Sequence, residues 1–182
     1  KRTQLVGRHN QANALAALLL MRGIATYEEA RAGLESFRPL PHRMQFVAEK
    51  KGVRFYDDSK ATNVDSVVAG LDGFPTPFGL IAGGRDKGGS DAPLQAALQH
   101  NACRAVVLIG AAAEKIAADL EGVTLLERAG TLERAVQIAK DRARAGDIVL
   151  LAPACASFDQ FENYEQRGRI FKDLVAKLSA QT

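Results

Sequence analysis

Residues 53–71 read VRFYDDSKATNVDSVVAGL, and this stretch decides the fold. It opens with an apolar and aromatic run over residues 53–56 that predicts a strand. It ends with an apolar stripe at the i, i+3, i+4 and i+7 spacing of a helix, formed by Val64, Val67, Val68 and Leu71. The polar residues between them therefore lie at the carboxyl end of a strand and the amino end of a helix. In open α/β sheets, ligands bind at such positions.

The polar residues of this stretch suit a site for anions, because N–H groups at the start of a helix favour negative charge. Asp58 is suited to ribose hydroxyls, Lys60 to a phosphate or carboxylate, and Thr62 to a second anion. The alternative interpretation is a solvated turn, in which Thr62 or Asn63 caps the following helix. The stretch alone leaves both interpretations open.

The same order of strand, loop and helix recurs along the rest of the chain. A hairpin is predicted over residues 44–58, and Thr131 is expected to cap one of the later helices. Continuous apolar runs, typical of strands buried on both faces of a parallel sheet, occur at 78–82, 105–109, 123–126 and 147–152. We therefore expect a doubly wound α/β fold, with a mostly parallel sheet that begins with the hairpin.

The first 39 residues follow a different pattern and predict two helices. Asn10 is expected to cap the first helix, and a Thr26–Glu29 capping box begins the second. Pro39-Leu40-Pro41 then breaks the helical pattern. We expect a domain boundary there, which separates residues 1–39 from residues 40–182. Two helices alone bury little surface, so the first segment is expected to belong to a domain that lies mostly outside this sequence.

Composition excludes several classes of protein. The chain has 182 residues, of which 47% are apolar, and a net charge of +3, which supports a globular protein. No stripe of basic and aromatic residues is present, so we do not expect nucleic-acid binding. The apolar runs are too short to span a membrane. Cys103 and Cys155 have no metal-binding or redox spacing, so we expect no metal site and a cytoplasmic location.

A second polar cluster, GGRDKGG at residues 83–89, follows a predicted strand. Its glycines permit close backbone approach, and it carries Lys87. It is neither a G-x-x-x-x-G-K-[ST] loop, which occurs nowhere in the chain, nor a G-x-G-x-x-G loop. The alternative interpretation is a flexible surface loop.

Two further clusters lie near predicted strand ends. Small residues before Ser157 favour a tight anion-binding turn after the last strand, whereas Cys155 has no histidine nearby in sequence and is better interpreted as a packed residue. His42 is either a general base or a hydrogen-bonding loop residue, and we favour the latter. Arg43 suits bidentate phosphate recognition, the alternative being an ordinary surface arginine.

These clusters together resemble one family, the Mur ligases. The blocks that carry the resemblance are HNxxN from His9, LPHR from Leu40, DSKATN from Asp58, GG from Gly83 with Lys87, and PACASFDQF from Pro153. The SKATN and ACAS blocks look like the branch that adds D-glutamate to UDP-N-acetylmuramoyl-L-alanine. The resemblance covers nearly the whole chain.

The resemblance implies a three-domain enzyme. Residues 1–39 look like the tail of its central ATP-binding domain, and residues 40–182 look like its entire carboxyl-terminal, Rossmann-like domain. The sequence contains no phosphate-binding loop and none of the family's Mg²⁺ ligands. ATP and Mg²⁺ are therefore the expected cofactors of a longer, monomeric enzyme, and these residues alone are expected to be inactive.

The implied reaction is a step of peptidoglycan precursor synthesis. The L-alanine carboxylate attacks the γ-phosphate of ATP, which yields ADP and an acyl phosphate. The amine of D-glutamate then displaces phosphate and forms the amide. Because charge moves among several anions, positioned cations are the main requirement, and Lys60 is the expected catalytic cation.

The resemblance also implies binding roles for residues that match the family's motifs. The residues expected to bind ATP are Asn10 and Asn13 at adenine, Arg43 at phosphate and Asp58 at ribose. The residues expected to hold the D-glutamate carboxylates are Thr62, Lys87, Ser157 and Tyr164. Position 164 is often Phe in the family, and if the contact there is made through the backbone N–H, the change to Tyr164 costs little.

Two other classes of function remain open. A folylpolyglutamate-type ligase shares the architecture but adds L-glutamate to a folate, and the ACAS block argues against it. A non-catalytic Rossmann-like domain that binds a nucleotide or another protein is the second alternative. The absence of a phosphate-binding loop favours that alternative for the isolated chain.

Overall fold

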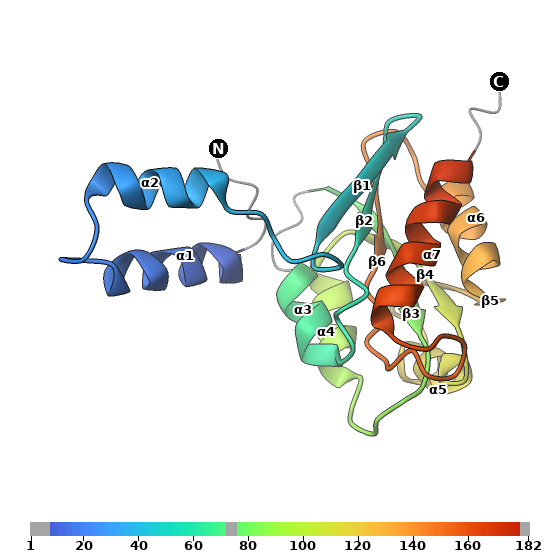
Figure 1. Ribbon diagram of the computed structural model, residues 1–182. Helices are drawn as coiled ribbons and strands as arrows, with labels where there is room; N and C mark the ends of the chain where they lie inside the picture. The colour runs from blue at the N-terminus through green and yellow to red at the C-terminus, as the bar shows by residue number, and fades with distance from the viewer. Residues whose placement is uncertain (1–7, 72–75, 179–182) are drawn as a thin grey trace.

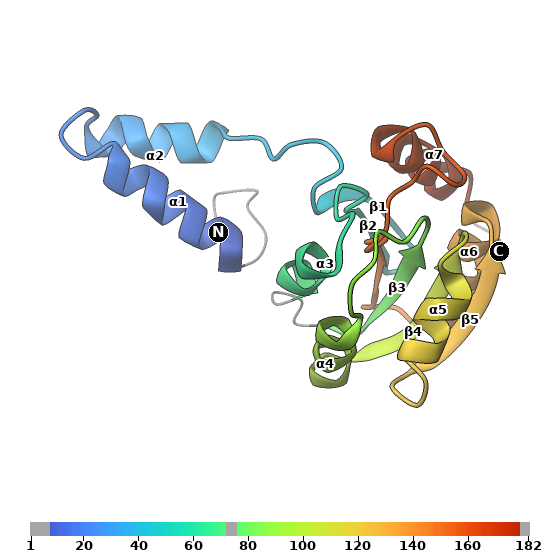
Figure 2. The same cartoon turned by 90° about the horizontal axis from the view of Figure 1, so that it is seen from below.

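The computed structural model describes residues 8–71 and 76–178. Two amino-terminal helices lie beside a sheet domain that has helices on both faces (Figures 1 and 2). The expected α/β fold with a mostly parallel sheet is confirmed.

The described sheet has six strands in the spatial order β1-β2-β6-β3-β4-β5. The strands are β1 (Gln45–Lys50), β2 (Val53–Asp57), β3 (Phe78–Gly83), β4 (Cys103–Ile109), β5 (Leu125–Gly130) and β6 (Ile148–Leu151). β1 pairs antiparallel with β2 as the predicted hairpin, and the other neighbours pair in parallel.

The burial of each strand follows its position in the sheet. Every residue of β3 and β6 is buried, as their continuous apolar runs predict. The prediction of a strand at 123–126 was wrong in its bounds, because β5 continues through Glu127 and Arg128 to Gly130. β5 is an edge strand, so part of it faces solvent and carries polar side chains that an apolar run does not reveal.

Helices cover both faces of the sheet and enclose two apolar cores. α3 (Val64–Leu71), α4 (Ala92–His100) and α5 (Ala113–Asp119) pack on one face, and α6 (Leu132–Arg142) and α7 (Tyr164–Lys177) pack on the other. Thr131 caps α6, as predicted. At α3 the capping side chain is Asn63, whose Oδ1 accepts the Ser66 N–H at 2.8 Å. Thr62 is therefore left available for other contacts.

The order of the strands places the polar loops together. From β3 the chain moves outward to β4 and β5, and then β6 returns to lie between β2 and β3. Because parallel crossovers are right-handed, this reversal moves α6 to the opposite face. The carboxyl ends of β2, β6 and β3 are therefore neighbours at the point where the strand order reverses, which is where such sheets bind ligands.

The amino-terminal pair consists of α1 (Arg8–Leu20) and α2 (Tyr27–Ser36). The Thr26–Glu29 capping box of α2 is confirmed. The prediction that Asn10 caps the first helix was wrong, because the helix already includes Arg8 and therefore places Asn10 inside its first turn.

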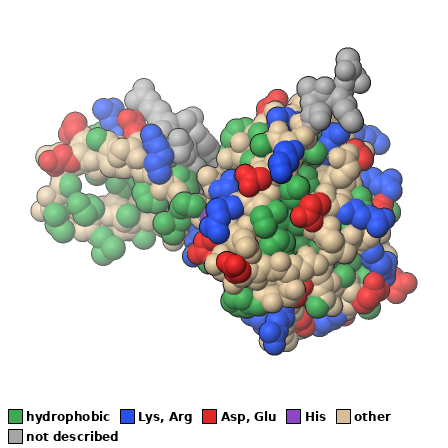
Figure 3. Space-filling model, turned by 45° about the vertical axis from the view of Figure 1, so that its right-hand side comes forward, with side chains coloured by type: hydrophobic (Ala, Val, Ile, Leu, Met, Phe, Trp, Pro, Cys, Tyr) green, Lys and Arg blue, Asp and Glu red, His purple; other side chains and the backbone are tan. Residues whose placement is uncertain are grey.

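Apolar side chains remain exposed on this pair, as Figure 3 shows for the face it presents; Leu19 and Tyr27 are 70% and 76% exposed. Across the described ranges, no helix combines the length and apolar character needed to cross a membrane.

Candidate functional site

The loop after β2 is held by its own backbone and by Asp57. Asp58 donates its N–H to the Leu151 carbonyl at 2.8 Å, which continues the pairing of β2 with β6. Asp57 is fully buried, and its Oδ1 accepts the Ser59 N–H at 2.9 Å. The first residues of the polar loop are therefore buried and continue the sheet, whereas Lys60 and Thr62 are partly exposed and Asn63 caps α3, as the alternative interpretation expected.

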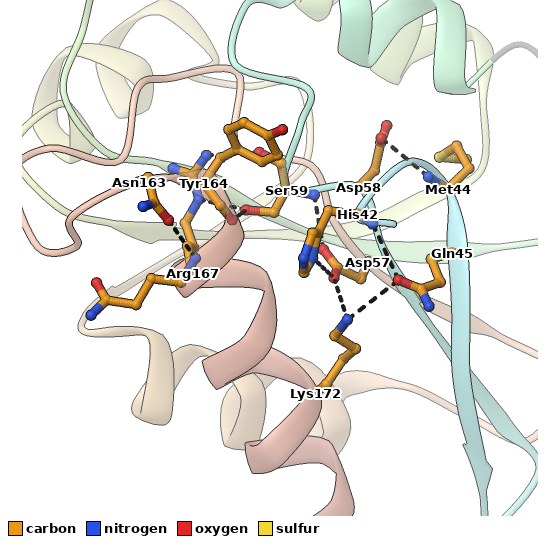
Figure 4. Close-up of polar contacts among 11 residues, drawn as sticks. His42, Met44, Gln45, Asp57, Asp58, Ser59, Asn163, Tyr164, Arg167 and Lys172 are labelled. Carbon is orange, nitrogen blue, oxygen red and sulfur yellow. Dashed lines mark hydrogen bonds and ion pairs between the residues drawn. The ribbon is translucent and has the colours of Figure 1, made fainter. Parts of the chain in front are cut away.

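The other oxygen of Asp57 anchors the linker, residues 37–44, which joins the amino-terminal helices to the sheet domain. His42 Nδ1 lies 2.6 Å from Asp57 Oδ2, and both side chains are buried (Figure 4). Lys172 Nζ lies 3.9 Å from the same oxygen. Gly168 leaves room for the ring, since an added Cβ would lie 2.1 Å from His42 Nδ1. These contacts support the interpretation of His42 as a hydrogen-bonding residue that fixes the linker.

Arg167 joins three segments at the strand ends. Its Nε donates to the Ser59 hydroxyl and its Nη2 donates to the Ser59 carbonyl, each at 2.9 Å. Both terminal nitrogens also donate to the Cys155 carbonyl at 3.3 Å. Ser59 Oγ then donates to the Tyr164 carbonyl at 2.8 Å. Arg167 is fully buried, and no carboxylate of the described residues forms an ion pair with it. Burial lowers the pKa of Arg167 to about 10. We call His42, Asp57, Ser59 and Arg167 the buried clasp.

Lys60 extends from the clasp toward the surface. Its backbone N–H donates to the His42 carbonyl at 3.1 Å. Its Nζ donates to the Tyr164 hydroxyl at 3.1 Å and lies 4.7 Å from the centre of the ring, within cation–π range. The Tyr164 hydroxyl also lowers the pKa of the Glu165 carboxyl by hydrogen bonding. The predicted catalytic lysine and Tyr164 are therefore in direct contact through their side chains.

Asp58 is buried and tied to the linker, with Oδ1 accepting the Met44 N–H at 3.2 Å. Burial is the main reason that the pKa of Asp58 rises to about 6. The hydrogen bond from Met44 and the charge of Arg43 act in the opposite direction. This carboxyl is thus ionised at neutral pH at a cost in folding free energy.

Three cavities surround these residues. One of about 290 Å³ lies between α1, α2 and the linker, lined by Asn10, Asn13, Leu34, Phe37, Leu40 and Arg43 among others. A second of about 150 Å³ includes Arg43, Asp58 and Lys60 in its wall. A third of about 350 Å³ lies against the loop after β3 and includes Thr62 and Lys87. Arg43 belongs to the first two cavities, which therefore adjoin.

The structure brings Thr62 and Lys87 together, since Lys87 Nζ donates to Thr62 Oγ1 at 3.1 Å. Ser157 is only 2% exposed, and it is not among the described residues that line the three cavities. Its loop is nevertheless joined to the loop after β3, because Arg85 and Ala156 exchange two backbone hydrogen bonds of 2.8 and 3.0 Å. Cys155 is buried, and burial raises the pKa of its thiol to about 11, which fits a packed residue.

Sequence reasoning missed Arg167 and Asp57. The sequence did contain a signal for Arg167. This arginine lies three, four and seven residues before Ile170, Phe171 and Leu174, and it therefore falls on the apolar stripe of α7. A charged residue at a core position of a helix indicates a buried polar contact. Within the described ranges, no group of three or more His, Cys, Asp or Glu residues could hold a metal ion.

The fold and the site define a class, a Rossmann-like α/β domain with a polar crevice where its strand order reverses. The family follows from sequence comparison, since residues 42–155 match the description "Mur ligase, glutamate ligase domain". The chain belongs to the Mur ligase family.

Curated relatives agree with this assignment. The chain is 52% identical over 172 residues to a UDP-N-acetylmuramoylalanine–D-glutamate ligase of Acidobacterium capsulatum, covering 94% of the chain and 37% of that relative. It is 51% identical over 179 residues to the ligase of the same name from Chromobacterium violaceum, covering 97% of the chain and 39% of the relative. The chain thus spans about two fifths of the length of the curated relatives it matches.

Solved structures share the fold. The UDP-N-acetylmuramate-alanine ligase MurC from Thermotoga maritima matches with a TM-score of 0.69 at 16% identity, covering 96% of this chain and 39% of that one. FolC from E. coli, in complex with ADP, matches with a TM-score of 0.63 at 22% identity, covering 94% and 40%. An identity of 22% to FolC shows only that the two proteins share a fold. The chain is about half identical to the D-glutamate ligases, so sequence similarity favours them over the folate-type alternative.

Proposed function

We propose that this chain is the carboxyl-terminal part of an ATP-dependent ligase that adds D-glutamate to UDP-N-acetylmuramoyl-L-alanine. The names of relatives about half identical to it support this reaction. The ligase would act in the cytoplasm as a monomer. We also propose a domain boundary near residue 39, because the proline-containing linker there joins the helix pair to the sheet domain.

The observation that carries the proposal is the shared position of Arg43. The first cavity is mainly apolar and offers the amides of Asn10 and Asn13, which suits a flat base with hydrogen-bonding edges such as adenine. The second cavity offers the Asp58 carboxylate for ribose hydroxyls and Lys60 for phosphate. Since Arg43 lines both, a nucleotide would extend from the helix pair across the linker to Lys60.

The amino acid would bind on the other side of Lys60. Thr62 and Lys87 together offer a hydroxyl and an ammonium to a carboxylate at the third cavity. Ser157 and the segment around Tyr164 would contribute donors from the neighbouring loops. Lys60 would then lie between phosphate and incoming D-glutamate, where a fixed cation stabilises the charge that develops as phosphate leaves the acyl group.

Mg²⁺ would bind together with ATP through ligands outside this chain, since the described residues contain no group of three or more His, Cys, Asp or Glu that could hold a metal ion. We assign no Mg²⁺ contact to this chain. ATP would supply the leaving phosphate when bound, and the residues of this chain would orient the nucleotide and the amino acid.

The test compares two variants of the full-length ligase that contains this chain. Lys87→Ala is expected to raise the KM for D-glutamate about 10- to 150-fold, because a charge-assisted hydrogen bond contributes roughly 1.5–3 kcal/mol. The KM for ATP should change little. Asn13→Ala should do the reverse and raise the KM for ATP alone.

Steady-state kinetics with each substrate varied in turn gives the result. If Lys87→Ala changes the constant for ATP and not that for D-glutamate, Lys87 belongs to the nucleotide site. If neither variant changes either constant, the assignment of the cavities is wrong.

A further inference from the structure

The loop that carries Lys87 has few supports of its own. Residues 84–91 connect β3 to α4, and most of them are exposed. Gly88 and Gly89 have φ values of 80° and 124°, and nothing lies within 4 Å of a Cβ added at either residue. The middle of the loop is therefore not packed where side chains would lie, and its position depends on a few polar contacts.

Lys115 on α5 contacts three residues of the loop. Its Nζ lies 2.8 Å from Asp91 at the end of the loop and 3.7 Å from Asp86, the residue next to Lys87. The same ammonium lies 3.4 Å from the Gly89 carbonyl. Hydrogen bonding to Asp91 is the main reason that the pKa of Lys115 is raised.

The third cavity has an unfavourable balance of charge for an anion. Its wall includes the acidic residues Asp65, Asp86 and Asp91 and one lysine, Lys87. Lys115 does not line the cavity, yet its ammonium pairs with two of the three carboxylates. Because like charges repel at short distance, a dicarboxylate would meet a less negative wall when Lys115 is present.

We infer that Lys115 is a positioning residue for D-glutamate binding, which holds the Lys87 loop closed onto α5 and offsets the charge of Asp86 and Asp91. This inference rests on the proposed function, because it takes Lys87 as the group that meets a glutamate carboxylate. Lys115 acts through the loop and makes no contact with substrate.

The fourth contact of Lys115 provides a matched control. Asp119 lies one turn further along α5, 3.3 Å from the same ammonium, and belongs to neither the loop nor the cavity wall. Asp119→Asn removes one ion pair of Lys115 and leaves the contacts to the loop intact. Lys115→Met removes all of them but keeps the apolar stem, and Lys115→Arg keeps the charge.

In the full-length ligase, Lys115→Met is expected to raise the KM for D-glutamate roughly tenfold, less than Lys87→Ala, because Lys115 acts only through the loop. The KM for ATP should stay near that of the wild type. The Tm is expected to fall, because the buried Asp91 carboxylate loses its ion pair, so the KM values are compared well below the unfolding temperature of both proteins. Lys115→Arg should restore most of the affinity, and Asp119→Asn should resemble the wild type.

A second measurement reports the loop without using activity. Trypsin should cut after Lys87 faster in Lys115→Met than in the wild type or in Asp119→Asn. Equal cutting rates together with an unchanged KM for D-glutamate would overturn the inference. If Lys87→Ala itself leaves that KM unchanged, the proposed function of the loop fails, and faster cutting in Lys115→Met would still show that Lys115 holds it.

Discussion

Two strand-end loops each present one lysine of the candidate site, and they are supported in different ways. The loop after β2 presents Lys60 from the buried clasp, whose groups are hydrogen-bonded beneath the surface. The loop after β3 presents Lys87 from an exposed segment that ion pairs on Lys115 tie to α5. Folding therefore fixes the first lysine firmly, whereas the second can adjust. In the proposed ligase, this difference would let Lys60 hold phosphate in place while Lys87 adjusts to the incoming amino acid.

The largest expected effect comes from breaking the clasp. Arg167→Leu removes the guanidinium that joins Ser59 to Cys155 and leaves buried carbonyls without donors. We expect the free energy of unfolding of the 182-residue chain to fall by about 2–6 kcal/mol, because each of the two buried carbonyls left without a donor costs roughly 1–3 kcal/mol. Urea unfolding followed by circular dichroism measures this.

The control for that variant lies on the same helix. Arg169 is exposed, and Arg169→Leu should change the stability by no more than about 0.5 kcal/mol. If the two variants unfold at the same urea concentration, the clasp does not hold the strand-end loops.

The next effect separates chemistry from folding. In the full-length ligase, Lys60→Ala should reduce turnover about 10²–10³-fold, because a preorganised cation is removed from the reacting centre. Stability should fall by only roughly 0.5 kcal/mol, since Lys60 is partly exposed and its neighbours in the clasp remain. Single-turnover rates and thermal unfolding of the same preparation decide the matter. Near-normal turnover at normal stability would show that Lys60 is an ordinary solvated lysine with no part in the reaction.

The smallest effect is a dependence of stability on pH. Burial raises the pKa of Asp58 from 3.8 to about 6, so the folded chain holds a proton that the unfolded chain releases between these values. The contribution of Asp58 to the free energy of unfolding is therefore fully present below pH 3.8, where the carboxyl is protonated in both states. It is lost as the pH rises through about 6, because the folded chain must then bury the charge. Asp58→Asn should become more stable than the wild type over that window, by up to about 3 kcal/mol at neutral pH.

Urea unfolding of both proteins between pH 4 and 7 gives this difference directly. The Asn variant keeps an acceptor for the Met44 N–H, so the comparison isolates the charge. A stability difference that does not change with pH would show that Asp58 titrates as an ordinary exposed carboxyl.

Much of the fold could be predicted from the sequence, because buried strands and helix caps are local patterns. The apolar runs located β3, β4 and β6, and the capping box located α2. The bounds of β5 could not be predicted in this way, because its polar side chains reflect its place at the edge of the sheet. That place depends on the order of all the strands.

In the candidate site, too, some residues could be predicted from local patterns and others could not. Lys60, Thr62 and Lys87 were identified because each follows a predicted strand and matches a family motif. The partners that hold these loops are distant in sequence: Arg167 lies 108 residues from Ser59, and Lys115 lies 24 residues from Asp91. Such pairs depend on how α5 and α7 pack against the sheet, which no local pattern records.

The place of β6 in the sheet has a consequence for how the chain reaches its native state. β6 is the last strand of the described chain, yet it lies between β2 and β3, and the β1–β2 hairpin has no other link to the sheet. While the protein is being made, the first five strands therefore leave a gap at the centre that nothing earlier in this sequence fills. Pairing over such long sequence separations is slow. A ribosome that pauses before residue 148 would hold a half-built sheet with two exposed strand edges, which are surfaces that chaperones and proteases recognise.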